Sequence, residues 1–158
     1  MKSKTLALIR KYENGPGDLI AAVDGLNESQ LDRRLSPGKW SIRQQINHLA
    51  DSELNMVHRM KKVLSEDTPL LMAFDQDKWA KRSSYENLSA ENSVALFYTL
   101  RAAMVPILKS LQEKDFERFG IHSENGKVSL KDLLEDAIEH SEHHTKQIES
   151  IKRKHKIR

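Results

Sequence analysis

Histidines are the residues of this chain whose type and spacing could support metal chemistry. His140 and His144 are four positions apart, and on a helix that spacing brings two imidazoles within reach of one ion. The chain has no cysteine, which excludes thiolate metal sites, disulfides and cysteine nucleophiles. A metal must therefore be held by histidine, aspartate, glutamate or water. The seven histidines are His48, His58, His122, His140, His143, His144 and His155.

The third metal ligand has to come from another helix, and His48 is the candidate. Along the helix expected near residues 130–154, His144 falls about 40° and His140 about 80° from the centre of the apolar stripe, on the same side. His143 falls about 140° away, so we expect it to face solvent or a neighbouring subunit. His48 lies roughly 130° from the apolar centre of its own helix, a position typical of an exposed residue. Spacing alone is compatible with a metal site, or with two histidines at the core edge and one at the surface.

Glu53 is a carboxylate that the helical pattern places at the centre of an apolar stripe. An inward carboxylate is costly unless it is paired. Glu53 could act as a general base, orient a metal ligand, or bond Arg59, Tyr98 or a helix end, and we favour the structural role because structural pairs also perturb acids. No catalytic residue is assigned from the sequence, and Glu53 and Asp51 are the two weak candidates.

Other side chains could support or enclose the site. Asp51 flanks His48, and Gln147 flanks the pair on the last helix, so either could hold the second nitrogen of a ligand histidine. Trp40, Trp79 and Tyr85 could wall a pocket or belong to the core. The remaining histidines, His58, His122 and His155, are expected at the surface.

Four long helices have to position these residues. Apolar residues at helical spacing predict helices at about 5–25, 42–64, 89–113 and 130–154. The first is expected to bend at 15–17, and Pro106 is expected to kink the third. The connection 65–88 is long and aromatic, with a short helix expected at 75–82. We therefore predict an all-α four-helix bundle with a long crossover connection between helices 2 and 3, so these two need not be antiparallel neighbours.

Composition limits the class of protein. The 158 residues are 38% hydrophobic and 31% charged, which is typical of a globular chain, and 1–158 is expected to form a single domain. No apolar run approaches the ~20 residues that span a bilayer. The first residues lack the apolar segment of a signal peptide, so a cytoplasmic protein is expected.

The basic charge is concentrated at the end of the chain. Residues 145–158 carry six Lys or Arg and one acid, so the segment has a charge of +5 and the other 144 residues sum to −2, giving +3 in total. Lys and Arg at a helix C-terminus complement the macrodipole, and no recognition motif accompanies them. We therefore expect no nucleic-acid partner and no membrane partner.

Three segments resemble the DinB/YfiT-like superfamily in order and spacing: 37–53 (PGKWSIRQQINHLADSE), 74–80 (FDQDKWA) and 140–148 (HSEHHTKQI). The resemblance extends, with gaps, over nearly the whole chain. It implies a four-helix bundle, often a homodimer, with zinc or nickel on three histidines that match His48, His140 and His144. Characterised members include metal-dependent S-transferases that use low-molecular-weight thiols, others are named as metal-dependent hydrolases, and many have no known activity.

The expected function is therefore a metal-dependent enzyme acting on a small molecule, either by thiol S-transfer or by hydrolysis. Three neutral imidazoles leave a coordination position for water or substrate, as catalytic zinc sites do. The alternative is a non-catalytic helical-bundle binding protein whose metal site is vestigial or regulatory.

Overall fold

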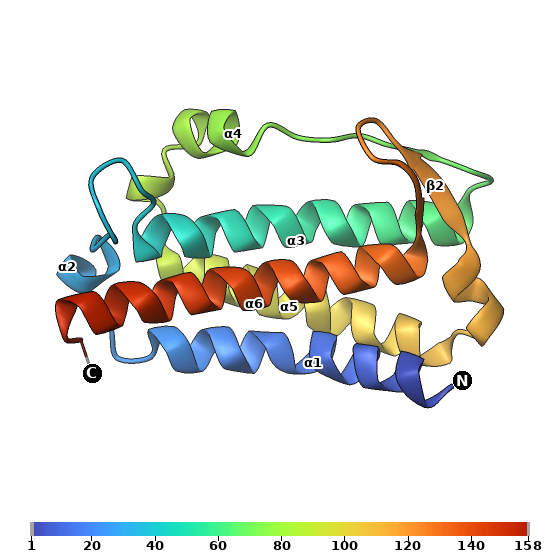
Figure 1. The fold of residues 1–158 in the computed structure, drawn as a ribbon, viewed down its shortest axis with the longest axis horizontal. Helices are drawn as coiled ribbons and strands as arrows, with labels where there is room; N and C mark the ends of the chain where they lie inside the picture. The colour runs from blue at the N-terminus through green and yellow to red at the C-terminus, as the bar shows by residue number, and fades with distance from the viewer. Residues whose placement is uncertain (1, 158) are drawn as a thin grey trace.

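The computed structural model describes residues 2–157, and four long helices dominate it (Figure 1). These are α1 (Ser3–Val23), α3 (Ile42–Ser65), α5 (Ala90–Ser110) and α6 (Leu130–His155). The shorter helical segments are α2 (Glu28–Leu31), α4 (Gln76–Arg82), η1 (Tyr85–Asn87) and η2 (Glu113–Glu117). The strands are β1 (Leu70–Leu71), β2 (Phe119–His122) and β3 (Gly126–Ser129). Among residues 2–157, no helix is both long and apolar enough to cross a membrane.

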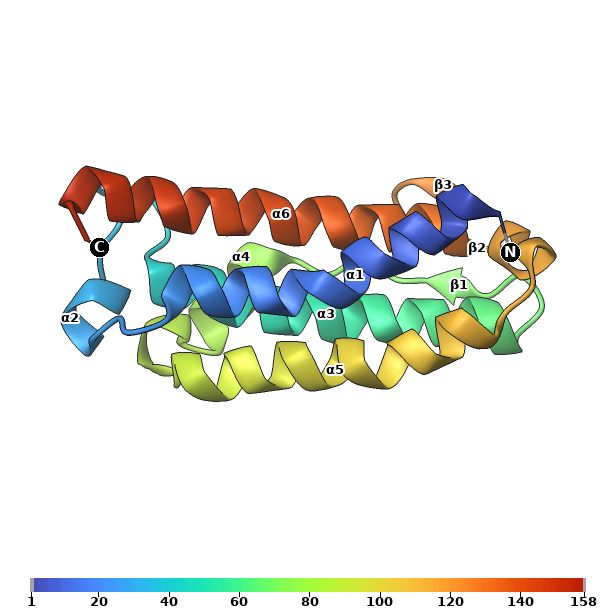
Figure 2. The ribbon, with the colours of Figure 1, turned by 90° about the horizontal axis from the view of Figure 1, so that it is seen from below.

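The four long helices form the predicted bundle, and its connectivity includes the predicted crossover. α1 packs against α5 and α6, and α3 packs against the same two helices. α3 and α5 lie side by side and run in the same direction (Figures 1 and 2). The chain between them therefore has to return along the whole bundle, and it does so over the outer side of α3, carrying α4.

Side-chain caps begin three of the helical segments. Asn27, Ser41 and Ser129 each accept a bond from the backbone N–H three residues on, and each makes a reciprocal capping box. The third long helix ends at Ser110, three residues before its predicted end. Gln112 and Asp115 form a capping box of their own there, which starts a new helical turn in place of a further turn of α5.

A small three-stranded sheet, which was not predicted, covers one end of the bundle. β2 and β3 form an antiparallel hairpin, and β1 adds to β2 in parallel. The close approach of β1 to β2 requires a glycine, because a Cβ at Gly120 would lie 2.7 Å from the carbonyl oxygen of Pro69. Strands this short leave hardly any alternation to detect in the sequence.

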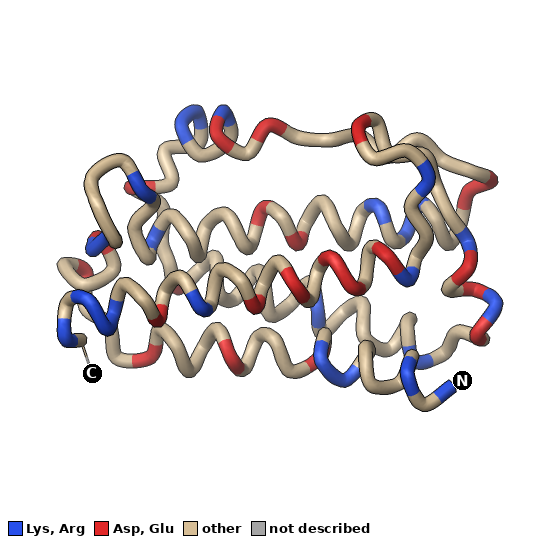
Figure 3. The backbone as a smooth tube through the Cα atoms, in the orientation of Figure 1, with Lys and Arg blue, Asp and Glu red and all other residues tan. Residues whose placement is uncertain are grey.

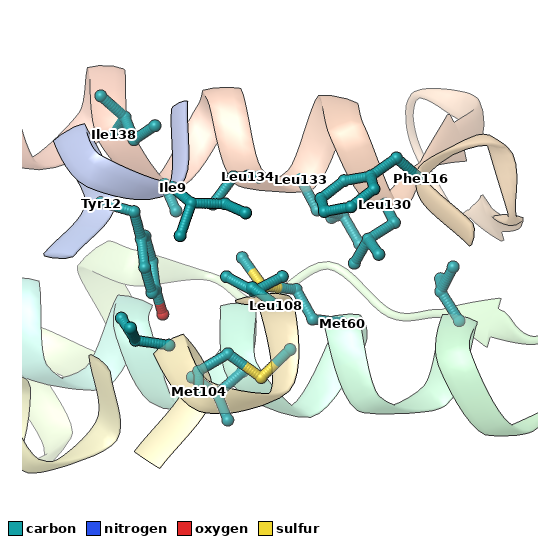
Figure 4. Packing of buried hydrophobic residues seen from close by; sticks show 14 of the residues in the cluster. Ile9, Tyr12, Met60, Met104, Leu108, Phe116, Leu130, Leu133, Leu134 and Ile138 are labelled. Atoms are coloured by element: carbon teal, nitrogen blue, oxygen red, sulfur yellow. The ribbon is translucent and has the colours of Figure 1, made fainter. Parts of the chain in front are cut away.

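The hydrophobic core is divided into two clusters. The first lies toward the sheet and includes Tyr12, Met60, Met104, Leu108 and Leu134, several of which face one another in Figure 4. The second lies toward the opposite end and includes Leu19, Ile46, Phe97 and Ile148. On every long helix, buried polar side chains or the Gly-Pro pair occupy the stretch between the two clusters.

Arg101 is the centre of this polar layer, and its side chain is 1% exposed. Its Nε donates to Glu53 of α3 at 2.9 Å, and its Nη1 donates to the Tyr12 carbonyl of α1 at 3.2 Å. Its Nη2 donates to the Ala137 carbonyl and the Ser141 hydroxyl of α6, at 2.7 and 3.1 Å. One guanidinium on α5 thus joins the other three long helices.

The Gly15-Pro16 pair allows Arg101 to bond the backbone of α1. α1 passes through the predicted bend at 15–17 as one continuous helix. Pro16 has no N–H and therefore frees the Tyr12 carbonyl, four residues earlier, which Arg101 then uses. A Cβ at Gly15 would lie 2.2 Å from Nη1 of Arg101, so the glycine makes room for the guanidinium.

The basic residues at the C-terminal end of α6 contact the end of α1 and the loop that follows α2. Lys152 donates to the Ala22 carbonyl, Lys154 to the Leu35 carbonyl, and a His155 nitrogen lies 2.9 Å from the Arg34 carbonyl. Figure 3 shows acids along the first half of α6 and bases at its end, as the helix dipole favours. Arg158, also part of the predicted basic tail, lies outside the described residues.

Candidate metal centre

Three histidines from two helices converge in the polar layer. His48 of α3 and His140 and His144 of α6 point their Nε2 atoms at one another. Nε2 of His140 lies 3.0 Å from that of His48 and 3.1 Å from that of His144. One ring nitrogen from each residue lies within 4.8 Å of the other two. The four-residue spacing of His140 and His144, together with the packing of α3 against α6, therefore brings the three predicted ligands together.

The nitrogen positions fit a single divalent ion. Imidazole nitrogens bind zinc at ~2.0–2.1 Å, so cis or tetrahedral ligands on one ion stand roughly 3–3.4 Å apart. The two short separations, 3.0 and 3.1 Å, lie at this spacing. No carboxylate belongs to the cluster among residues 2–157, so the donor set is three imidazoles, which suits zinc, nickel or copper better than calcium or magnesium.

Burial keeps all three imidazoles neutral. Desolvation is the largest cause of a lowered pKa at each of them, and repulsion from neighbouring histidines adds to it. The pKa falls to about 3 for His48, about 4 for His140 and about 3 for His144. At neutral pH each ring therefore has a nitrogen lone pair available without prior loss of a proton.

His48 is 1% exposed, whereas helical periodicity predicts an exposed side chain. The first half of α3 is covered on more than one side, because the crossover packs on the face that the bundle leaves open. Trp40 and Phe74 lie against His48, with ring centroids 4.7 and 6.5 Å away. The amide of Asn47 donates to the Tyr85 carbonyl at 2.6 Å and ties the crossover to α3.

Gln45, which was not among the predicted site residues, supports His144. Its side-chain oxygen lies in hydrogen-bond contact with Nδ1 of His144. An Nδ1–H that donates to Gln45 leaves Nε2 unprotonated and directed at the other two histidines. Gln45 lies three residues before His48 on α3, so it shares a face with a predicted ligand, and this spacing was a usable signal.

Of the two residues predicted to hold a ligand histidine, Gln147 contacts His144 and acts to raise the pKa of that ring, whereas Asp51 bonds elsewhere. The Gln147 amide pairs with His143, 2.7 Å away. Asp51 accepts a 2.5 Å hydrogen bond from the hydroxyl of Tyr85, and burial together with Asp51 raises the pKa of that phenol.

The Glu53 carboxylate is hydrogen-bonded to other side chains of the polar layer. It accepts from Arg101 and, at 2.5 Å, from the Tyr12 hydroxyl. The suggested partners Arg59 and Tyr98 are therefore wrong: Arg59 bonds the Met72 carbonyl, and Tyr98 is exposed. The correct partners come from α1 and α5, and no pattern within α3 could identify them.

Two cavities meet at the histidines. The tryptophan cavity has a volume of about 510 Å³, and its walls include Lys39, Trp40, Gln45, His140 and His144. The arginine cavity has a volume of about 440 Å³, and its walls include His48, Ser52, Arg59, Phe74 and His140. His140 lines both, so the cluster is accessible from two sides.

The remaining aromatic and histidine predictions have mixed outcomes. Tyr85 is buried, and Trp79 is 36% exposed and packs on Phe74. His58 and His143 are exposed, as expected. His122 is buried, contrary to the prediction, and its Nδ1 accepts from the backbone N–H groups of the hairpin turn at 124–125.

Comparisons with known proteins identify relatives across nearly the whole chain. The sequence profile described as the DinB superfamily matches residues 11–148. A protein of Oceanobacillus iheyensis is 34% identical over 139 residues, which is 88% of this chain and 78% of that protein. Its name is "putative metal-dependent hydrolase".

Solved structures share the fold. YfiT from Bacillus subtilis is described as "a probable metal-dependent hydrolase with an unusual four-helix bundle topology". It matches with a TM-score of 0.92 at 29% identity, over 99% of this chain and 90% of that chain. A mycothiol-dependent maleylpyruvate isomerase matches with a TM-score of 0.73 at 12% identity, over 91% of this chain and 60% of that one. At that identity the likeness concerns the fold alone.

Proposed function

This chain belongs to the DinB superfamily, and from that premise we propose that it is a metal-dependent enzyme whose ion is held by His48, His140 and His144. The observation that carries the proposal is the convergence of three neutral imidazoles, each within 4.8 Å of the others, at the meeting point of two cavities. A structural metal site is closed by four protein ligands, whereas three ligands beside a cavity leave room for a reactant.

The ion we propose is zinc or nickel, and when bound it would supply Lewis-acid chemistry that lowers the pKa of a water or thiol. The protein's own residues prepare the site. Gln45 fixes the ring orientation of His144, while Trp40 and Phe74 shield His48 from bulk water. The Arg101 layer holds α3 and α6 in register, one turn from the ligands.

Two reactions fit this site. Hydrolysis is favoured by the names of the relatives, which call them metal-dependent hydrolases. Transfer of a thiol to an electrophile is favoured by the presence of two cavities. The thiol and the electrophile are both organic molecules and each would occupy a cavity, whereas hydrolysis has only one organic reactant. In the transfer, sulfur bonds the electrophilic carbon, a leaving group departs with its electron pair, and the thiol proton goes to solvent or to the leaving group.

Metal content tests the site. Protein purified without chelator should contain close to one zinc or nickel ion per chain, and His48→Ala should lose most of it. His58→Ala is the matched control, because His58 is an exposed histidine on the same helix. A wild-type protein that contains no metal and takes up neither added zinc nor added nickel would overturn the proposal.

A paired assay separates the two reactions in metal-loaded protein. A nitrophenyl ester reports hydrolysis, and a small thiol with a chlorodinitrobenzene reports transfer, in which chloride is released. Loss of either activity in His144→Ala assigns that reaction to the site. If metal-loaded protein binds small ligands without turnover, and His144→Ala changes neither ligand binding nor thermal stability, the non-catalytic alternative holds.

We also propose that the protein forms a homodimer, as the family resemblance implies, and that its substrate is a small molecule, with a low-molecular-weight thiol as the candidate. Sedimentation equilibrium of the full chain measures the oligomeric state directly, and a concentration-independent monomer mass would contradict the dimer.

A further inference from the structure

Three arginines are buried among residues 2–157, and the partners of two of them are carboxylates. Arg101 is 1% exposed and pairs with Glu53. Arg43 is 6% exposed and pairs with Glu28 and Asp32. A guanidinium taken out of water is costly unless an opposite charge and hydrogen bonds compensate it. The fold therefore supplies an acid wherever these two arginines are buried.

Arg59 is the exception. It is 8% exposed, and its Nη2 donates to the Met72 carbonyl at 2.6 Å. Among residues 2–157, no carboxylate lies within ion-pair distance of it, and its Nε and Nη1 donate to no protein acceptor. Burial is the main influence on its pKa and lowers it, while Asp136 and Glu124 oppose that effect from farther away. Arg59 thus has a charge without a partner.

Arg59 also lines a cavity. Arg59 lines the arginine cavity together with His48 and His140, and the apolar side chains of Met56 and Phe74 complete much of its wall. A volume of about 440 Å³ falls within the range of small-molecule sites. A ligand in this cavity can therefore approach two of the three clustered histidines and the arginine together.

We propose that Arg59 binds a carboxylate of the substrate in the arginine cavity, while the reacting group of the same molecule lies at the histidines. This inference rests on the proposed function, because it takes the histidine cluster as the reacting end. The ligand's carboxylate supplies the counter-charge that Arg43 and Arg101 obtain from the protein. Arginine forms strong charge-assisted hydrogen bonds with carboxylates.

Acids at the mouth of the cavity modulate the site. Asp136 and Glu139 line it from α6, and both are exposed. Glu124, also exposed, and His122 lie toward Arg59 from the hairpin. These carboxylates offset the charge of Arg59 without reaching it, and they disfavour ligands that carry several negative charges. The site therefore suits a single carboxylate on an otherwise uncharged molecule.

The test uses full-length protein loaded with Co²⁺ and a series of mercaptocarboxylic acids of increasing chain length, each paired with its neutral amide. The readout is the absorption that a thiolate produces on binding cobalt. At least one acid should bind about 10-fold or more tightly than its amide, as expected for a hydrogen-bonded charge pair. In Arg59→Gln the acid and amide should bind equally, whereas Lys61→Gln, which removes an exposed charge from the same helix, should keep the preference.

The outcomes separate this inference from the proposed function. If neither acid nor amide gives a cobalt–thiolate signal, the metal site itself fails. If both bind equally to wild-type protein at every chain length, the carboxylate site is overturned while the metal site stands. Asp136→Asn provides a second variant that leaves Arg59 in place. It should tighten acid binding and leave amide binding unchanged, and weaker acid binding would contradict the inference.

Discussion

At the scale of single residues, the candidate metal centre depends on how each imidazole is held. The Gln45 contact defines which nitrogen of His144 carries the proton. His140 and His48 lack an equally close partner for Nδ1 among the described residues; the nearest is the Ser52 hydroxyl, 3.5 Å from Nδ1 of His48. Orientation of the site therefore relies on one glutamine more than on any other side chain.

Gln45→Ala should weaken zinc binding by about 10- to 100-fold, because loss of a partner to the second nitrogen frees the ring to rotate and change tautomer. Competition with a metal indicator dye measures the affinity. His58→Ala is the control, since His58 is an exposed residue on the same helix and lies outside the cluster. Equal losses in the two variants would refute the role of Gln45.

The depressed histidine pKa values predict how the metal-free protein responds to acid. In the unfolded chain these rings titrate near 6.5, whereas in the folded protein the pKa is about 3 for His48 and about 4 for His140. Between these pH values the unfolded state binds more protons, so the free energy of unfolding falls as pH drops from 6.5 toward 4. The slope contributed is at most about 1.4 kcal/mol per pH unit for each histidine.

Urea denaturation of metal-free protein at several pH values measures this slope. A variant with His48, His140 and His144 all replaced by alanine should show a shallower dependence over the same range. A wild-type slope no steeper than that of the variant would rule out the neutral, buried state of the three rings.

At the scale of secondary-structure elements, α1 is shaped by what it packs against. Proline in a helix interior normally costs stability because it leaves a carbonyl without a partner. Here Pro16 releases the Tyr12 carbonyl to Arg101, and Gly15 lets the guanidinium approach. The Gly-Pro-Gly run therefore acts as a docking position for Arg101 on a continuous helix.

Gly15→Ala should destabilise the protein by about 1–3 kcal/mol, because the new Cβ displaces a guanidinium that is held by three other helices and leaves buried polar groups unpaired. Gly17→Ala is the control in the same helix. Its Cβ would meet nothing within 4 Å, so higher helix propensity should leave it neutral or stabilise it by up to about 1 kcal/mol. Chemical denaturation compares the two, and equal effects would contradict the account of Gly15.

At the scale of the whole molecule, a polar layer separates two hydrophobic clusters and contains both the Arg101 network and the histidines. The network joins all four long helices, and the histidines join α3 to α6. Because α3 and α5 run in parallel, the crossover has to pass over α3, and this brings Phe74 to His48, which Trp40 from the chain before α3 also contacts. The connectivity that covers the site is thus a consequence of the helix order.

An ion that bridges α3 and α6 should stabilise the entire bundle. Binding at 100 times the dissociation constant adds about 2.7 kcal/mol, which for a chain of this size corresponds to a rise in Tm of roughly 5–10 °C. Calorimetry of the protein with zinc, and after removal of zinc by a chelator, tests this. His144→Ala should show no such shift, and a shift as large as that of the wild type would place the bound ion elsewhere.

The sequence determined the features that depend on local spacing. Helical periodicity located the four long helices, capping residues marked where three helical segments begin, and the four-residue interval paired His140 with His144. The length of 65–88 allowed the crossover. The helices, their caps and the histidine pair follow from contacts within one helix, and the crossover follows from the length of one connection. Residue spacing and segment length are both visible in the sequence.

Only the tertiary structure decided the rest. Periodicity reports the single face that a helix buries against its neighbours, so it could not show that the crossover buries the opposite face of α3 and encloses His48. In the same way, Glu53 pairs with Arg101 and His144 contacts Gln45 across helices far apart in sequence. Each bond between helices depends on their order and register, which are properties of the assembled bundle.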